Sequence, residues 1–133
     1  MNKAKRILVI DDDPLVHKVI RRAFGGSFEV LSIYDPREAM ATAAVEEIDL
    51  IILDVCMPNL DGHSLASLFK EDVLTRDIPV LMLTGLSGGE AMLDGMAAGA
   101  DTYMTKPFDV DELYDWGSRL ITQGREESVR ERT

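Results

Sequence analysis

The stretch ILVIDDDPLV, residues 7–16, places four apolar residues directly before three aspartates and a proline. A short apolar run is typical of a buried strand, and Asp13 followed by Pro14 is typical of a helix that begins with an N-cap aspartate. The stretch therefore predicts a strand that passes into a helix. Because neighbouring carboxylates repel each other, we expect a compensating group close to Asp11 and Asp12.

The rest of the chain repeats this alternation of an apolar run and an amphipathic stretch, in five rounds. Two of the runs, LIIL and VLML, are continuously apolar, as are central parallel strands that are covered on both faces. The pattern predicts an α/β fold with a parallel sheet and helices between the strands. The predicted strands are 6–10, 28–33, 49–54, 79–84 and 101–105.

Local signals locate several of the helices and the end of the ordered domain. Asp35 before Pro36 and Asp109 before Val110 are predicted N-caps. Val110, Leu113, Trp116 and Leu120 form one apolar stripe on the last helix, which predicts that Trp116 packs in the core. The segment 85–100 is the weakest predicted helix, because each internal glycine costs nearly 1 kcal/mol relative to alanine. Residues 123–133 are predicted to be a charged, frayed tail or linker stub.

Composition limits the class of protein. With 133 residues, of which 46% are hydrophobic and 29% charged, the chain has the size and composition of one soluble domain. A formal net charge of −10 argues against nucleic-acid binding by this domain. The apolar runs are too short for a membrane span, and no signal peptide is recognisable. Together with a single cysteine, Cys56, these features predict a cytoplasmic location.

Polar side chains follow four of the predicted strands. Asp11 and Asp12 follow the first strand, Asp54 ends the third, Thr84 ends the fourth and Lys106 follows the fifth. Ligands of parallel α/β sheets bind beyond the carboxyl ends of the strands. Three carboxylates, an ammonium group and a hydroxyl group predict a site for a hard divalent cation, Mg²⁺ above all, together with an anion.

Four motifs share one family resemblance. They are VIDD (9–12), LDVCMPNLDG (53–62), LTG (83–85) and YMTKPF (103–108). In order, spacing and strand placement they resemble the receiver domain of bacterial response regulators of two-component signalling, of the chemotaxis-regulator-like kind. The resemblance implies a receiver domain over residues 1–122, with a flavodoxin-like, doubly wound sheet of strand order 2-1-3-4-5. It also implies a cis bond between Lys106 and Pro107.

The resemblance also implies roles for the polar residues. Asp54 would be phosphorylated by a sensor histidine kinase or a histidine phosphotransfer protein, in a signalling module rather than an enzyme with turnover. Phosphorylation would change the surface of the predicted fourth helix (85–100), the fifth strand (101–105) and the last helix, which follows Asp109, and a target or a second copy could bind there. The implied ligands for Mg²⁺ or Mn²⁺ are Asp11, Asp12, Asp54 and the backbone carbonyl of Cys56. Thr84 and Lys106 would contact the phosphoryl group. Thr84 and Tyr103 would be the switch residues.

Two other functions are alternatives at this point. A haloacid-dehalogenase-like phosphatase would use Asp11 and Asp13 as a DxD pair, but the chain is short for that fold and Pro14 favours capping by Asp13. A receiver-like scaffold that signals without phosphorylation is the second alternative. His17 and His63 lack metal-ligand spacing, so we expect both at surface or docking positions. No motif supplies a base for a reactive Cys56 thiol.

Overall fold

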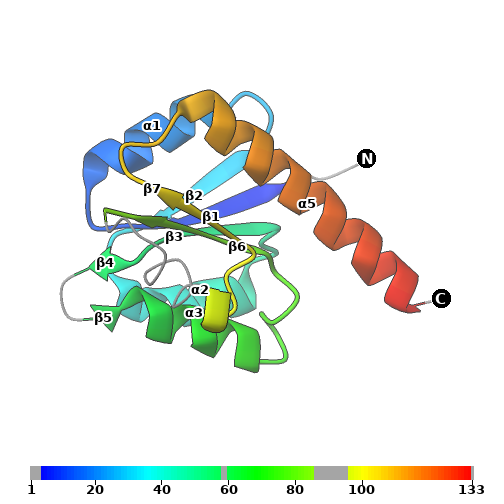
Figure 1. Cartoon of the computed structure of the whole chain (residues 1–133). Helices are drawn as coiled ribbons and strands as arrows, with labels where there is room; N and C mark the ends of the chain where they lie inside the picture. The colour runs from blue at the N-terminus through cyan, green and yellow to red at the C-terminus, as the bar shows by residue number, and fades with distance from the viewer. Residues whose placement is uncertain (1–3, 58–59, 86–95, 133) are drawn as a thin grey trace.

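The computed structural model describes residues 4–57, 60–85 and 96–132. Within them, five parallel strands form one sheet in the order β2-β1-β3-β6-β7 (Figure 1). Because β6 and β7 are the fourth and fifth strands of this sheet along the chain, the predicted order 2-1-3-4-5 is confirmed. The strands are β1 (Arg6–Ile10), β2 (Glu29–Ile33), β3 (Leu50–Asp54), β6 (Val80–Thr84) and β7 (Thr102–Thr105).

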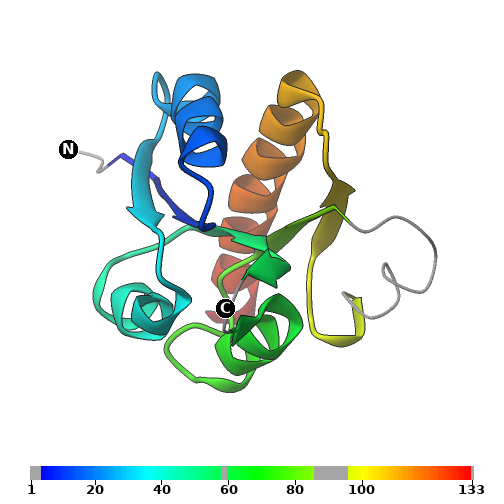
Figure 2. The same ribbon diagram turned by 90° about the vertical axis from the view of Figure 1, so that its left-hand side faces the viewer.

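Helices cover both faces of the sheet, and a short antiparallel pair lies beside it (Figures 1 and 2). Helices α1 (Pro14–Phe24) and α5 (Val110–Arg132) lie on one face. The other face carries the 3-10 helix η1 (Pro36–Glu38), α2 (Ala39–Val45) and α3 (Gly62–Glu71). The antiparallel pair consists of β4 (Cys56–Met57) and β5 (Leu60–Asp61).

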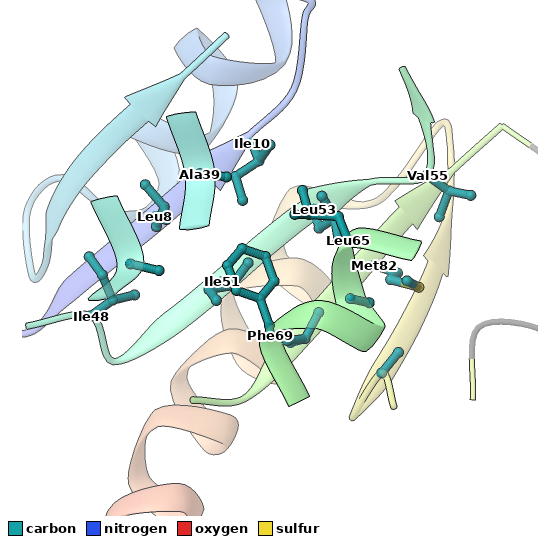
Figure 3. Packing of buried hydrophobic residues seen from close by; sticks show 14 residues of the cluster. Leu8, Ile10, Ala39, Ile48, Ile51, Leu53, Val55, Leu65, Phe69 and Met82 are labelled. Carbon is teal, nitrogen blue, oxygen red and sulfur yellow. The ribbon is translucent and has the colours of Figure 1, made fainter. Parts of the chain in front are cut away.

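Alternate residues of each strand enter two separate cores, because side chains of a strand point to opposite faces. In β1, Leu8 and Ile10 pack with α2 and α3, as Figure 3 shows, and Ile7 and Val9 pack with α1 and α5. Phe69 of α3 is fully buried in the first core. Burial of apolar side chains on both faces explains why the central strands are continuously apolar.

The predicted N-caps are confirmed. Asp13 Oδ1 accepts a hydrogen bond from the backbone N–H of Leu15 at 2.9 Å, and Asp109 Oδ1 accepts one from Glu112 at 3.1 Å. Asp35 also caps the turn that follows it, but that turn is the 3-10 helix η1, so α2 begins only at Ala39. Tightened first turns of this kind are common at helix N-termini.

The predicted core position of Trp116 is wrong. Trp116 is 38% exposed, and among the α5 side chains that the structure describes, those up to residue 123, the buried positions are Leu113, Gly117, Leu120 and Ile121. A Cβ at Gly117 would lie only 2.9 Å from Phe24 Cζ. The glycine therefore lets α5 approach Phe24 of α1 closely. Trp116 precedes it by one residue and so points about 100° away from this contact.

The C-terminal residues are helical, and their assignment as a charged tail or linker stub outside the domain stays a prediction. Helix α5 continues to Arg132, through the segment predicted to be a frayed tail or linker stub. Arginine, glutamate and glutamine dominate that segment and are good helix formers, so the helix continues without an apolar stripe. Most of the predicted helix 85–100 lies outside the described residues. The Lys106–Pro107 peptide bond is cis, as the family resemblance implied.

Candidate functional site

The carboxyl ends of the strands bring the predicted site residues together. Asp11 follows β1, Asp54 ends β3, Thr84 ends β6 and Lys106 follows β7. The register of β3 and β6 pairs Asp54 with Leu83, the neighbour of Thr84. Strands β6 and β7 end side by side, because Thr84 pairs with Thr105. The parallel sheet therefore places polar side chains from four strands at one edge.

Three aspartates form the acidic part of this site. Carboxylate oxygens of Asp11, Asp12 and Asp54 all lie within 4.8 Å of one another. Asp11 is 1% exposed and Asp54 is 4% exposed, whereas Asp12 lies on the surface. Two ligands of one Mg²⁺ lie at most about 4 Å apart, twice the metal–oxygen distance of about 2.1 Å. An all-oxygen donor set of this size fits a hard divalent cation once the carboxylate oxygens move slightly closer together. The exposed Asp12 leaves the site open to solvent.

Lys106 supplies the compensating charge that the sequence called for. Its Nζ lies 3.2 Å from Asp11 Oδ2 and 3.5 Å from Asp54 Oδ1. Burial works to lower the pKa of Lys106, but the two carboxylates outweigh it, so the pKa is raised above its ordinary value. Lys106 is therefore a fixed cation between two buried anions.

Asp11 experiences opposing influences. Desolvation is the largest and raises the pKa of its carboxyl group, and the nearby charge of Asp54 raises it further. The backbone N–H of Asp13, which donates to Asp11 Oδ1 at 2.9 Å, and the ammonium of Lys106 act in the opposite direction. The net effect is a raised pKa, which means that ionised Asp11 is incompletely compensated and would gain from a dication.

The predicted switch residues lie on the two neighbouring strands. Thr84 is fully buried, and its backbone carbonyl accepts a hydrogen bond of 2.6 Å from the N–H of Lys106. Tyr103 is half-buried on β7, opposite Met82, and packs against the core that faces α2 and α3. Thr84 is therefore linked through the backbone to Lys106, and Tyr103 lies further back along β7.

The predictions for Cys56 and Asp13 concern the rim of the site. Cys56 begins β4, two residues after Asp54. That its backbone carbonyl binds a metal stays a prediction. Asp13 is engaged as the N-cap of α1 through its Oδ1. This use of Asp13 argues against the phosphatase alternative, in which Asp13 would be half of a reactive pair with Asp11.

The prediction of a surface position for His17 is wrong. His17 is 1% exposed, and its Nε2 lies 2.6 Å from the backbone carbonyl oxygen of Asp11. His63, on α3, is half-buried rather than exposed. The spacing of His17, Ile20 and Phe24 is the signal that could have located the first histidine, because residues at i, i+3 and i+7 share one helix face.

Comparison with known proteins agrees with the site. Residues 7–116 match the family model of the response regulator receiver domain. The DNA-binding dual master transcriptional regulator RpaA of Synechocystis is 39% identical over 109 residues, which are 81% of this chain and 45% of RpaA. The phosphate regulon transcriptional regulatory protein PhoB of Pseudomonas aeruginosa is 37% identical over 110 residues, 82% of this chain and 48% of PhoB. The chain thus spans less than half the length of either relative.

Solved structures share the fold over nearly the whole chain. A CheY-like response regulator receiver domain protein from Methanospirillum hungatei has a TM-score of 0.86 at 25% identity, covering 94% of this chain and 99% of the other. The receiver domain of Francisella response regulator 1452 has a TM-score of 0.82 at 31% identity, covering 90% and 98%. With the sheet order, the acidic cluster and these matches in agreement, the chain belongs to the response regulator receiver domain family of two-component signalling.

Proposed function

We propose that Asp54 accepts a phosphoryl group with the help of a bound Mg²⁺ and of Lys106. One observation carries this proposal. The Asp54 carboxylate lies within 4.8 Å of the oxygens of Asp11 and Asp12 and 3.5 Å from Lys106 Nζ. Asp54 thus has both an acidic cluster and a cation as neighbours, and Asp11 shares this environment. Of the two, Asp54 is the residue that the family resemblance identifies as the phosphoacceptor.

The proposed step is a phosphoryl transfer from a phosphohistidine of a sensor kinase or phosphotransfer protein. An oxygen of Asp54 attacks phosphorus, a P–O bond forms, the P–N bond breaks, and the electron pair leaves with the imidazole. The charge spread over the transferring group must be neutralised in the transition state. Asp11, Asp12, Asp54 and the Cys56 carbonyl would hold Mg²⁺ or Mn²⁺, which would supply positive charge at the phosphoryl oxygens when bound.

Lys106 supplies the second positive charge. Before transfer, its ammonium group is paired with Asp11 and Asp54. Transfer converts the single charge of Asp54 into an acyl phosphate that carries more negative charge. Lys106 can then donate to a phosphoryl oxygen without moving far. Its raised pKa keeps it protonated throughout.

The signal would pass through Thr84 and Tyr103. The Thr84 hydroxyl, at the end of β6, donates to a phosphoryl oxygen, and the half-buried Tyr103 moves into the space that this change opens. Such a change would alter the surface formed by β7, α5 and the segment that precedes β7. Much of that segment, residues 86–95, lies outside the described residues. A target protein or a second copy of the chain would bind there.

The chain would therefore act as a signalling module, with self-catalysed phosphotransfer and autodephosphorylation only. RpaA and PhoB are named as transcriptional regulators, but DNA binding is not proposed for this domain, because the chain carries a formal net charge of −10. Among the described residues we find no helix with the length and apolarity that a membrane span requires. We propose a cytoplasmic location.

Intact-mass measurement after incubation with acetyl phosphate tests the proposal. The parent should gain the mass of one phosphoryl group with Mg²⁺ and none when the metal is chelated. Asp54→Asn should gain none, and Asp115→Asn, which changes an exposed aspartate of α5, should behave like the parent. Equal labelling of Asp54→Asn would contradict the assignment. A folded parent that takes no label would favour the scaffold that signals without phosphorylation.

A further inference from the structure

His17 is a buried ionisable residue that the proposed phosphotransfer does not use. Among the described residues, the ionisable side chains that are almost fully buried are those of Asp11, His17 and Asp54. His17 lies on α1, with its ring 4.1 Å from the ring of Tyr34 between centroids. A buried polar ring needs a reason to be there, because taking it out of water is costly unless its polar atoms are hydrogen-bonded.

The hydrogen bond to Asp11 supplies part of that reason and fixes the tautomer. His17 Nε2 lies 2.6 Å from the backbone carbonyl oxygen of Asp11. A carbonyl oxygen can only accept, so Nε2 carries the proton and donates. Within the described part of the chain, the buried Nδ1 has no hydrogen-bond partner. The ring therefore makes a single hydrogen bond, and that bond is to a residue of the acidic site.

Every polar group of Asp11 is engaged. Its N–H donates to the carbonyl of Ile33 at 3.2 Å, and its carbonyl accepts from His17. Its Oδ1 accepts from the N–H of Asp13 at 2.9 Å, and its Oδ2 accepts from Lys106 at 3.2 Å. Of these four bonds, the one that holds the Asp11 carbonyl oxygen comes from His17.

That carbonyl belongs to the peptide group that joins Asp11 to Asp12. The peptide group is planar, so a hydrogen bond that holds its oxygen also limits rotation about the adjoining bonds of both aspartates. Repulsion among the three carboxylates favours rotations that separate them. The His17 hydrogen bond opposes such rotations, and it does so from a helix that is packed into the core.

We propose that His17 is a positioning residue, which holds the Asp11–Asp12 peptide so that both carboxylates face a divalent cation. The inference rests on the proposed function, because it assigns Asp11 and Asp12 as ligands. Partners that orient metal ligands typically change metal affinity by about 10–100-fold when they are lost. His17 bonds to the backbone carbonyl of Asp11 and not to a carboxylate. We therefore expect the change in metal affinity to lie at the lower end of this range.

Two variants separate the hydrogen bond from simple packing. His17→Phe keeps a flat ring against Tyr34 and removes the donor. His17→Gln places an amide nitrogen at the same number of bonds from Cα as Nε2, so it restores a donor. If the hydrogen bond matters, His17→Gln should bind Mg²⁺ more like the parent than His17→Phe does, whereas a packing role would favour phenylalanine.

Mg²⁺ titration calorimetry on the full chain is the main measurement. We expect the dissociation constant to rise about tenfold in His17→Phe and to return most of the way to the parent value in His17→Gln. The Mg²⁺ concentration for half-maximal labelling by acetyl phosphate should shift by the same factor. Unchanged Mg²⁺ affinity in a cooperatively folded His17→Phe would overturn the proposal, and so would equal losses in both variants.

A second measurement needs no variant. Long-range ¹H–¹⁵N correlation spectra of the metal-free parent should show His17 with its proton on Nε2, and a proton on Nδ1 alone would overturn the proposal even if His17→Phe failed to fold. Failure of the proposed function looks different. In that case the parent would take no phosphoryl group on Asp54, while the tautomer and the Mg²⁺ affinities of the two variants would still decide the role of His17.

Discussion

Lys106 Nζ lies 3.2 Å from Asp11 Oδ2, although 95 residues separate the two along the chain. The pair joins the loop after β1 to the loop after β7, the two strands on either side of the central β3 and β6. The same ammonium group also contacts Asp54. It therefore compensates the charge of two buried carboxylates, and we expect it to compete with a dication for them.

Lys106→Met should have opposite effects on the fold and on metal binding. Loss of the charged hydrogen bonds should destabilise the metal-free protein by about 2 kcal/mol. Mg²⁺ should bind more tightly, because a competing cation has been removed. Urea unfolding and calorimetry measure the two effects.

Lys70→Met is a matched control for this prediction. Lys70 is paired with Asp101 at 2.9 Å, on α3 and away from the acidic cluster. This variant should alter stability without altering Mg²⁺ affinity. Weaker Mg²⁺ binding by Lys106→Met would show that the lysine does not compete with the metal.

Asp11→Asn should change the pH dependence of stability. Burial, aided by Asp54, raises the pKa of Asp11 above its ordinary value of 3.8. The folded state therefore holds this proton more tightly than the unfolded state, and the resulting stability is lost as pH rises through the raised pKa. Asparagine does not titrate, so the stability of Asp11→Asn relative to the parent should increase from about pH 4 to about pH 7. Urea unfolding in the presence of a chelator measures this difference, and a decrease across that range would contradict it.

Cys56→Ala and Asp12→Ala should separate backbone from side-chain ligation. Only the carbonyl of Cys56 is proposed to bind the metal, so Cys56→Ala should keep a Mg²⁺ affinity within a few-fold of the parent. Asp12→Ala removes a carboxylate ligand and should lose most of the Mg²⁺ affinity. Calorimetry compares the two, and a collapse of affinity in a folded Cys56→Ala would assign a role to the thiol.

Thr84→Ala should separate phosphorylation from its propagation. The variant should still be labelled on Asp54, because the Lys106 N–H bonds to the backbone carbonyl of residue 84 and not to its side chain. Amide exchange in β7 should respond to beryllofluoride, a phosphoryl mimic, in the parent and much less in Thr84→Ala. An equal response in both proteins would remove Thr84 from the switch.

The sequence predicted the five strands of the parallel sheet to within one residue at their starts, since short apolar runs bounded by aspartates and prolines leave little choice. The short pair β4 and β5 was not predicted. It also predicted the polar residues at the strand ends, of which Asp11, Asp12 and Asp54 meet in one cluster. Trp116 was misplaced because Gly117, which carries no hydrophobic signal, occupies the buried position beside it. His17 was misplaced because its partner is a backbone carbonyl, and no residue pattern marks such a partner.

Peptide mapping after borohydride reduction locates the phosphorylated residue, because this reagent converts an aspartyl phosphate to homoserine. The parent is first treated with acetyl phosphate and Mg²⁺, and an untreated sample is reduced in parallel. If Asp54 is the phosphoacceptor, homoserine should appear at position 54 alone, and only in the treated sample. Homoserine at position 11, 12 or 13, or none at position 54 in a sample whose intact mass has risen, would contradict it.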